Sequence, residues 1–290
     1  MPLPLISDTM PYNLDMKNNS HNKPATVYDS LADNYISWIE ESAGLKIIYR
    51  TFHRAVDDNK ARLIGRVLDL GCGTGIFTQI LSDVEGVTGI VGLDISKESV
   101  LNAKKRCNDR CRFVAGSATE LPFPDSSFDA VVAFGDTISH IYNGYGEAIS
   151  EIGRILKPGG HLLFDVDNKW NLGLLSEPHE LKAALQTISS GHIREWSFLD
   201  AFGDQCSLHF KTFRPSEIIG ILNGAGLSVL DFQGLIILPN IIPQQFHYNH
   251  SLERPMGRAV MALSRLDHII RRLPFFRGLG IGALIVARKR

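Results

Sequence analysis

The sequence predicts an α/β fold built on a mostly parallel sheet with helices on both faces. Between residues 62 and 167, short apolar segments suited to strands alternate with amphipathic segments suited to helices, and such alternation is typical of a parallel sheet. A glycine-rich stretch, "VLDLGCGTG" at 67–75, follows the first of these strands. The 290 residues are 44% hydrophobic and 21% charged, a composition that supplies a sizeable core. We expect a single domain over 27–290.

Two helices are predicted before the glycine-rich stretch. Residues 1–26 show little periodicity and are expected to form a flexible arm. In "TVYDSLADNYISWIEES", Tyr28, Leu31, Tyr35 and Trp38 recur at helical spacing, and "LKIIYRTFHRAV" continues the pattern. We interpret the two helices as an N-terminal helical cover.

The core elements follow in a regular order. The segment "RVLDLGCG" indicates a strand and its turn, and helices are predicted at 75–82 and 97–107. A further helix begins at Tyr145 and is stopped by "LKPGG", since Pro158 cannot extend a helix. The other predicted strands of this part are "IVGLDIS", "CRFVAGSA", "FDAVVAFGD" and "HLLFDVD".

The C-terminal part adds two strands and two long insertions. "RPSEIIGILNGAGLSVLDFQG" predicts a helix followed by a strand, and "IGALIVARK" predicts the closing strand. The core is therefore expected to comprise 62–167 and 212–290. The intervals 168–211 and 240–278, after the fifth and sixth strands, are expected to be insertions at the rim, where long connections tend to carry function.

The glycine-rich stretch predicts a binding site for a nucleotide or a related cofactor. A glycine-rich turn between a strand and a helix lets a ligand approach the main chain, and the helix N-terminus offers unpaired N–H groups. Gly71, Gly73 and Gly75 spell G-x-G-x-G, whereas the dinucleotide fingerprint is G-x-G-x-x-G. A Walker loop is excluded because no G-K-[ST] follows.

In these residues the chain resembles the class I S-adenosylmethionine-dependent methyltransferases, whose first motif is an acid followed by G-x-G-x-G. The resemblance extends over roughly residues 28–165 and includes "GSATELPFP" and "ILKPGGHLLFD". It implies a Rossmann-like sheet of seven strands in a three-layer sandwich. It also implies S-adenosylmethionine as the cofactor and S-adenosylhomocysteine as the product. The cofactor-binding residues that it implies in the first motif are Asp69, Gly71, Cys72, Gly73 and Gly75.

The resemblance assigns further residues to the adenosine part of the cofactor. Asp94, at the end of the next predicted strand, would accept hydrogen bonds from both ribose hydroxyls, and Ile95 would pack on the adenine. The alternative role for Asp94 is to cap the following helix, but Ser96 can serve that purpose. Ser117 replaces an acid that often reads the adenine amino group, so Ser117 or the Ala118 main chain would contact the base.

The methionine part of the cofactor has four candidate neighbours. Phe134 and Gly135 are expected at the C-terminal end of the fourth strand, where the crevice of an open α/β sheet lies. "YDSLADNY" is similar to an element that closes over the cofactor in many relatives, so Tyr28 and Tyr35 would cover the sulfonium, whose charge favours aromatic faces. Alternatively, both tyrosines are ordinary residues of an amphipathic helix.

The segment "FGDTISH", after the fourth strand, holds the catalytic candidates. Methyl transfer depends mostly on aligning the reactants in a dry pocket, and a base is needed only when the acceptor holds its proton. Asp136, Thr137 and His140 are expected to face the substrate. His140 titrates in the range suited to a general base, although a purely structural role is the alternative.

The acceptor is expected to be a small molecule. The element N/D-P-P-Y, which nucleic-acid amino methyltransferases often carry after the fourth strand, is absent, and this argues against nucleic acid. The broad resemblance is to the small-molecule branch that includes the quinone-biosynthesis methyltransferases. We therefore expect methyl transfer to O, N or C of a small metabolite, and a lipophilic metabolite is one candidate. The alternatives are an RNA or protein methyltransferase and a non-catalytic subunit that binds the cofactor.

The C-terminal segment 254–290 is basic, with nine Lys or Arg and one acid. Such a segment can contact an anionic membrane or lipid, although a solvated helix face is the alternative. The segment also contains apolar residues at helical spacing, which would rest on a membrane, cover a greasy substrate or pack on the core. These residues are Val260, Leu263, Leu266, Ile270 and Leu273.

No metal site is expected. The four cysteines include no C-x-x-C pair, and His247 and His250 have no acid or cysteine close in sequence. A contact with the substrate is the other interpretation of these two histidines. Reduced thiols, the absence of a signal-peptide pattern and the absence of a long apolar run together favour the cytoplasm, with peripheral membrane contact as an alternative.

Overall fold

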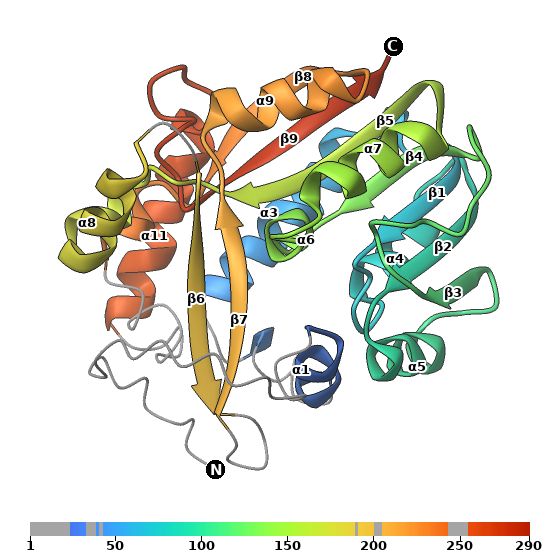
Figure 1. Ribbon diagram of the computed structural model, residues 1–290, viewed down its shortest axis with the longest axis horizontal. Coiled ribbons are helices and arrows are strands. Elements are labelled where there is room, and N and C mark those ends of the chain that lie inside the picture. Colours follow the sequence, from blue (N-terminus) through green and yellow to red (C-terminus); the bar gives the residue numbers. More distant parts are fainter. Residues whose placement is uncertain (1–23, 33–38, 41–42, 189–190, 200–204, 243–254) are drawn as a thin grey trace.

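The computed structural model describes residues 24–32, 39–40, 43–188, 191–199, 205–242 and 255–290 (Figure 1). The strands of its main sheet are β1 (Gly65–Leu70), β2 (Val87–Asp94), β3 (Cys111–Ala115), β4 (Phe128–Ala133), β5 (Leu156–Asp167), β8 (Leu227–Leu235) and β9 (Gly282–Lys289). Their order across the sheet is β3-β2-β1-β4-β5-β9-β8. β1 to β5 are parallel, and β9 runs antiparallel to both of its neighbours, β5 and β8. The predicted seven-stranded, mostly parallel sheet is therefore confirmed.

Helices cover both faces of this sheet and give three layers (Figure 1). The helices that carry the packing are α3 (Ala43–Asp58), α4 (Ile76–Ser82), α5 (Lys97–Arg106), α7 (Tyr145–Ile155) and α9 (Pro215–Gly224). On one face, α7 and α9 bury Ile152 and Leu222 in one apolar cluster. On the other face, α3 and α4 bury Phe52 and Leu81 in a second cluster.

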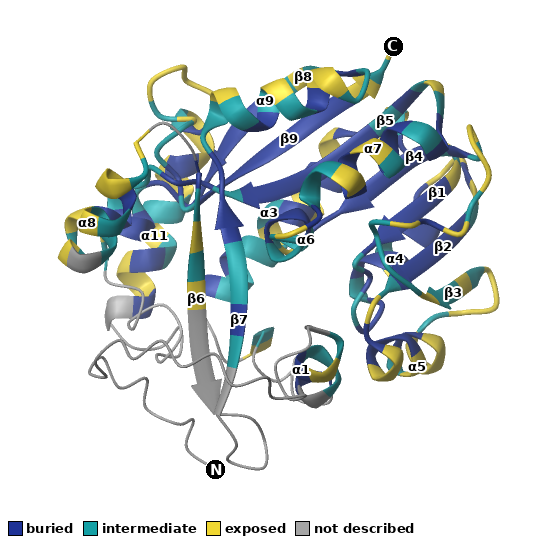
Figure 2. Cartoon of the chain, viewed as in Figure 1, coloured by how far each residue is buried: buried dark blue, intermediate teal, exposed yellow. Residues whose placement is uncertain are grey.

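The central strand β4 shows why these residues form a sheet between two helical layers. Val131 and Ala133 pack into the cluster on one face, whereas Ala130 and Val132 pack into the cluster on the other. All four are fully buried (Figure 2). Successive side chains of a strand point to opposite faces, so a strand that is covered twice is a continuous apolar run.

The prediction that "LKPGG" stops the helix is confirmed, since α7 ends at Ile155, directly before this segment. The following strand begins earlier than expected, because β5 starts at Leu156 and already includes "LKPGG". The residue before a proline is disfavoured in the helical conformation, so Lys157 adopts the strand that Pro158 continues. Gly159 then takes the left-handed conformation, with φ of 81°.

The interval 168–211 contains a second, two-stranded sheet that was not predicted. The interval contains η3 (Leu172–Leu175) and α8 (Pro178–Gln186). The second sheet is the hairpin formed by β6 (His192–Leu199) and β7 (Gln205–Thr212). In Figure 1 this hairpin extends away from the main sheet beside α1 (Pro24–Leu31) and α6 (Thr137–His140). Leu208 of β7 packs against Val27 and Leu31 of α1.

The interval 240–278 contains η4 (Pro239–Ile241) at its start and α11 (Pro255–Ile270), which lies against α3. Of the apolar face predicted here, Val260 is buried, but Leu266 and Leu273 are exposed. The predicted face is therefore split between the core and the surface. Within the ranges that the structure describes, no helix has the length and apolar character needed to cross a bilayer.

Candidate active site

The glycine-rich turn connects β1 to α4 with left-handed backbone at Gly71 and Gly73, whose φ angles are 73° and 49°. A Cβ atom on Gly71 would overlap Oγ1 of Thr137, so this glycine allows close packing inside the protein. A Cβ atom on Gly73 would have no atom within 4 Å. The two glycines therefore have different roles: Gly71 allows close packing against Thr137, whereas Gly73 borders open space.

Asp94, at the end of β2, lies directly against this turn. Its Oδ2 atom accepts a hydrogen bond from the Gly73 N–H at 2.7 Å, and its Oδ1 atom accepts one from the Ser96 N–H at 2.9 Å. Burial raises the pKa of the Asp94 carboxyl, and the two N–H donors oppose that shift. Each carboxylate oxygen can still accept from a further donor.

Ser96 caps α5, as the sequence analysis expected. Its hydroxyl oxygen accepts a hydrogen bond from the Ser99 N–H at 3.0 Å. The cap of α5 therefore does not require the Asp94 side chain.

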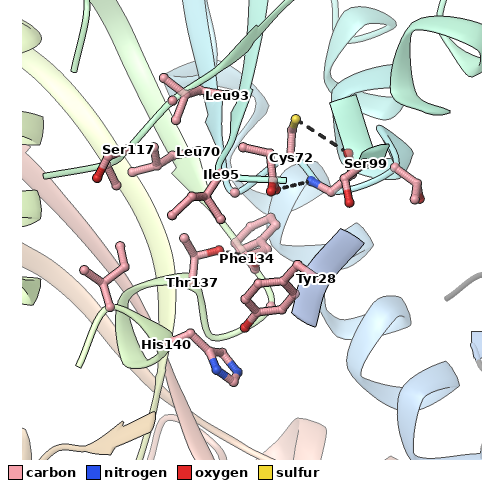
Figure 3. Close-up of a pocket in the computed structure, with 18 of the residues that line it drawn as sticks. Tyr28, Leu70, Cys72, Leu93, Ile95, Ser99, Ser117, Phe134, Thr137 and His140 are labelled. Atoms are coloured by element: carbon pink, nitrogen blue, oxygen red, sulfur yellow. Dashed lines mark hydrogen bonds between the residues drawn. The ribbon is translucent and has the colours of Figure 1, made fainter. Parts of the chain in front are cut away.

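The turn and Asp94 open into a cavity of about 510 Å³ at the carboxyl ends of β1, β2 and β4 (Figure 3). This is the position at which open α/β sheets bind ligands, and the volume lies in the ordinary range for a ligand pocket. The residues proposed from sequence that line it are Tyr28, Gly71, Cys72, Gly73, Asp94, Ile95, Ser117, Ala118, Phe134, Gly135, Thr137 and His140.

Three of the proposed residues are not among those that line the cavity. Asp69 is buried, its carboxylate accepts a hydrogen bond from the Thr78 hydroxyl at 2.5 Å, and burial raises its pKa to about 7. Gly75 precedes α4, where a Cβ atom would lie 2.9 Å from Ala103 Cβ. Asp136 is the third. The candidates Tyr35, His247 and His250 lie outside the described residues.

An aromatic group forms one wall of the cavity. Phe134 stacks on Phe52 with ring centroids 4.6 Å apart and also contacts Phe77 edge to face at 5.3 Å. Tyr49 of α3 stacks on Phe77 at 5.2 Å. The sequence predicted Phe134 here, but not Tyr49 and Phe77, whose rings come from two different helices.

His140 lies at the end of the cavity that faces the hairpin. Figure 3 shows the His140 ring beside Tyr28. The two rings meet edge to face with centroids 5.9 Å apart, and the His140 ring is 5.8 Å from the ring of Phe210 in β7. Its Nδ1 atom is buried without a hydrogen-bond partner among the described residues. Burial lowers the pKa of His140, and the charge of Asp136 opposes that shift. The imidazole is therefore neutral at neutral pH and has an unused ring nitrogen.

The turn that carries Asp136 is held by a residue that the sequence analysis missed. The N–H groups of Gly135 and Asp136 donate to Oδ1 and Oδ2 of Asp165, at 2.9 and 3.2 Å. Burial, together with the charge of Asp136, raises the pKa of Asp165. Asp136 takes φ of 57°, uncommon for a residue other than glycine. An acid inside the apolar run "LLFDVD" was the available signal for Asp165.

Other lining residues also went unnoticed in the sequence. Ser99 and Thr119 come from segments next to the cofactor motifs. Tyr142 and Asn143 come from the turn after α6, and "HIYNGYG" directly following the catalytic candidates was the signal for them. The apolar cavity thus has several polar side chains around its edge.

Comparisons with known proteins agree with this geometry. A family model described as "Methyltransferase domain" matches residues 67–160. The chain is 34% identical over 167 residues to the ubiquinone/menaquinone biosynthesis C-methyltransferase UbiE of Pseudomonas aeruginosa, over 54% of this chain and 63% of the relative. It is 36% identical over 100 residues to the fatty-acid O-methyltransferase of Mycolicibacterium smegmatis, over 34% of this chain and 36% of the relative.

A solved structure covers most of the fold. The [4+2]-cyclase SpnF is 22% identical, with a TM-score of 0.57 over 91% of this chain and 94% of that one. This structural similarity establishes the fold. The chain spans only 36% of the length of the fatty-acid O-methyltransferase and 63% of the length of UbiE. Residues 67–160 therefore match a methyltransferase domain, and the motifs and the seven-stranded sheet support a class I S-adenosylmethionine-dependent methyltransferase similar to the quinone-biosynthesis branch.

Proposed function

We propose that this protein transfers a methyl group from S-adenosylmethionine to O, N or C of a small, largely apolar acceptor. The observation that carries the proposal is the hydrogen bond between Gly73 and Asp94 at the mouth of a 510 Å³ cavity. Here a main chain open to a ligand and a carboxylate with free acceptor sites lie side by side. Both are needed to hold a nucleoside with two ribose hydroxyls.

The cavity residues suit that cofactor. Asp94 would accept from the ribose hydroxyls, and Ile95, whose side chain is 43% exposed, would pack on the adenine. Ser117 and Ala118 would contact the base edge, while Tyr28 would cover the sulfonium end. When bound, the cofactor supplies an electrophilic methyl group on a positively charged sulfur.

His140 is proposed as the proton acceptor when the methyl acceptor holds its proton. Its neutral imidazole has an unpartnered Nδ1 atom within the described part of the chain, so it can take a proton from an acceptor hydroxyl or amine. Asp136 would act through His140, because its charge favours the protonated ring. Tyr28 and Phe210, which contact the ring, would exclude water from it.

The aromatic wall supports an apolar acceptor. Phe134, Phe77 and Tyr49 present ring surfaces to the cavity, and ring surfaces favour ligands with little polar area. An acceptor such as RNA would instead require a positively charged approach to its phosphates.

The test is a pair of measurements on the whole chain. Calorimetric titration with S-adenosylmethionine and with NAD identifies the cofactor, and binding of NAD in place of S-adenosylmethionine would reject the proposal. Transfer of labelled methyl groups into a cell extract, separated into metabolite, RNA and protein fractions, then identifies the acceptor class. We expect label in a metabolite. Label in RNA or protein would support the macromolecular alternative, and cofactor binding without transfer would support a non-catalytic subunit.

We further propose that α11 and the turn after it contact an anionic membrane. Leu266, Ile269, Leu273 and Phe275 are 51%, 70%, 47% and 76% exposed. Clustered exposed apolar side chains are unusual on a soluble surface and mark an interaction site. The arginines at 265, 272 and 277 are exposed in the same segment, and they complement the charge of anionic lipid.

Vesicle flotation tests the membrane contact. We expect the protein to float with phosphatidylcholine vesicles that contain phosphatidylglycerol, and not with pure phosphatidylcholine. The double variant Ile269→Ser/Phe275→Ser should lose this binding, whereas Ile64→Ser/Leu101→Ser, which also changes two exposed apolar residues, should keep it. Equal flotation of both variants would contradict the assignment.

A further inference from the structure

A second cavity lies next to the first. Its walls come from the interval 168–211, from the turn after α6 and from the first residue of α7, and Tyr142 lines both cavities. The two cavities therefore share one wall residue. The polar residues of its lining are Tyr142, Tyr145, Gln186, Thr187, His192 and Lys211.

Lys211 is a buried cation on the wall of this second cavity. Its side chain is 9% exposed, and its Nζ atom lies 2.9 Å from Oε1 of Glu217 and 5.0 Å from the ring centre of Tyr145. Glu217 also accepts a hydrogen bond from the Gly191 N–H at 2.8 Å. The ammonium group has three donors, so it can serve a ligand while it keeps this ion pair.

Positive charge exceeds negative charge in the group formed by Lys169, Lys211, Arg214 and Glu217. Lys169 is fully buried, donates to the carbonyl and hydroxyl oxygens of Thr187, and interacts electrostatically with the other three members. Three positive charges and one negative charge leave a net charge of +2 in this group. Because Lys169 and Lys211 are buried, an anion bound beside Lys211 is favoured.

His192 offers a polar atom that lacks a partner. Its Nδ1 atom lies 3.1 Å from the Thr212 hydroxyl, but its Nε2 atom is buried with no hydrogen-bond partner in the described part of the chain. Leaving a buried polar atom unpaired costs free energy, so such an atom on a cavity wall points to a ligand.

We propose that the second cavity is a subsite for a carboxylate carried by the methyl acceptor. The proposal rests on the methyl transfer proposed above and names its substrate class, an amphipathic acid. Lys211 donates to the carboxylate. His192 donates through Nε2 in the neutral tautomer that carries its proton there, while Nδ1 accepts a hydrogen bond from the Thr212 hydroxyl. The apolar body of the acceptor extends past Tyr142, and the atom to be methylated lies in the first cavity.

The test uses two probes that differ only in their charged end. Octanoate and octanol are titrated calorimetrically into the whole protein in the presence of S-adenosylhomocysteine. We expect octanoate to bind about tenfold more tightly, the effect of a charged hydrogen bond. Lys211→Met, which keeps most of the side-chain stem, should abolish this preference. Lys104→Met, on the exposed side of α5, should leave it unchanged.

His192→Phe is the second variant, since Lys211→Met also removes the partner of Glu217 and can reduce folding. It should weaken the preference for octanoate without affecting octanol. Equal binding of the two probes by the native protein, or no binding of either, overturns the proposal. So does a preference that survives both variants. Binding of S-adenosylhomocysteine is recorded first, and its absence counts against the proposed function alone, because the octanoate titration involves no methyl transfer.

Discussion

Replacing Asp69 by asparagine should change how the stability of this protein depends on pH. Asp69 is buried behind the glycine-rich turn, and burial raises its pKa to about 7 from an unperturbed value of 3.8. The folded state therefore holds a proton that the unfolded state has lost at intermediate pH. A carboxyl whose pKa is raised on folding makes stability fall as pH rises, from the unfolded pKa up to the folded one.

The magnitude follows from the size of this window. Each pH unit within it costs about 1.4 kcal/mol. Between pH 5 and pH 8 the proton is lost at about pH 7, which is two units above pH 5, so Asp69 costs the native protein about 3 kcal/mol over this interval. The asparagine amide in the variant cannot ionise. The free-energy cost of burying this amide is therefore the same at pH 5 and at pH 8. The advantage of Asp69→Asn over the native protein should therefore grow by about 3 kcal/mol from pH 5 to pH 8.

Urea unfolding of the two proteins at pH 5 and pH 8, without ligand, measures this difference. The free energy of unfolding is extrapolated to water, and equal slopes confirm that the unfolded states are comparable. Thr78→Val is a useful comparison, because it removes the hydroxyl donor of Asp69 but leaves the titrating group. A free-energy difference between Asp69→Asn and the native protein that stays constant between the two pH values would refute the reasoning.

Three further predictions concern the site. Asp94→Ala should weaken S-adenosylmethionine binding about 100-fold, measured by calorimetry, since two hydrogen bonds to a charged acceptor are lost. His140→Phe should lower kcat/KM about 100-fold for an acceptor that holds its proton, and should remove the fall in rate that the native enzyme shows when the pH drops through the lowered pKa of His140. Gly71→Ala should destabilise the fold by about 1–3 kcal/mol more than Gly73→Ala in thermal unfolding, because Thr137 leaves no room for its Cβ atom.

Each of these three predictions has an outcome that would contradict it. Gly73→Ala carries the same left-handed strain as Gly71→Ala without the clash, so equal losses would mean that strain alone matters. Unchanged cofactor affinity in Asp94→Ala would remove this residue from the ribose site. An unchanged pH profile in His140→Phe would leave His140 a structural role.

The sheet could be predicted because each of its strands carries its own signal. Val131 and Val132 face opposite helical layers, and a strand buried on both sides must be apolar throughout. The hairpin β6–β7 gave no such signal, because its described part is partly exposed and carries charged residues such as Arg194 and Lys211. The burial of Lys211 depends on Tyr145 and Glu217, which come from other parts of the chain.

The two halves of the site differ in the same way. The proposed cofactor half was predictable because Gly71, Gly73 and Asp94 lie within one strand, turn, helix and strand, where local conformation determines their positions. The proposed acceptor half joins Tyr49 of α3, Tyr142 after α6 and Phe210 of β7, which are far apart in sequence. No local pattern brings such residues together.

The amino-acid sequence alone determined the glycine-rich turn, the strands of the main sheet and the cofactor that the turn suits. Only the tertiary structure decided that burial lowers the pKa of His140 and leaves its Nδ1 atom without a partner among the described residues, that burial raises the pKa of Asp69 to about 7, and that Leu266 stays exposed while Val260 is buried. The physical reason is the separation along the chain between the residues that determine each property. Backbone conformation depends on neighbours along the chain, whereas desolvation and charge depend on whatever the fold packs nearby.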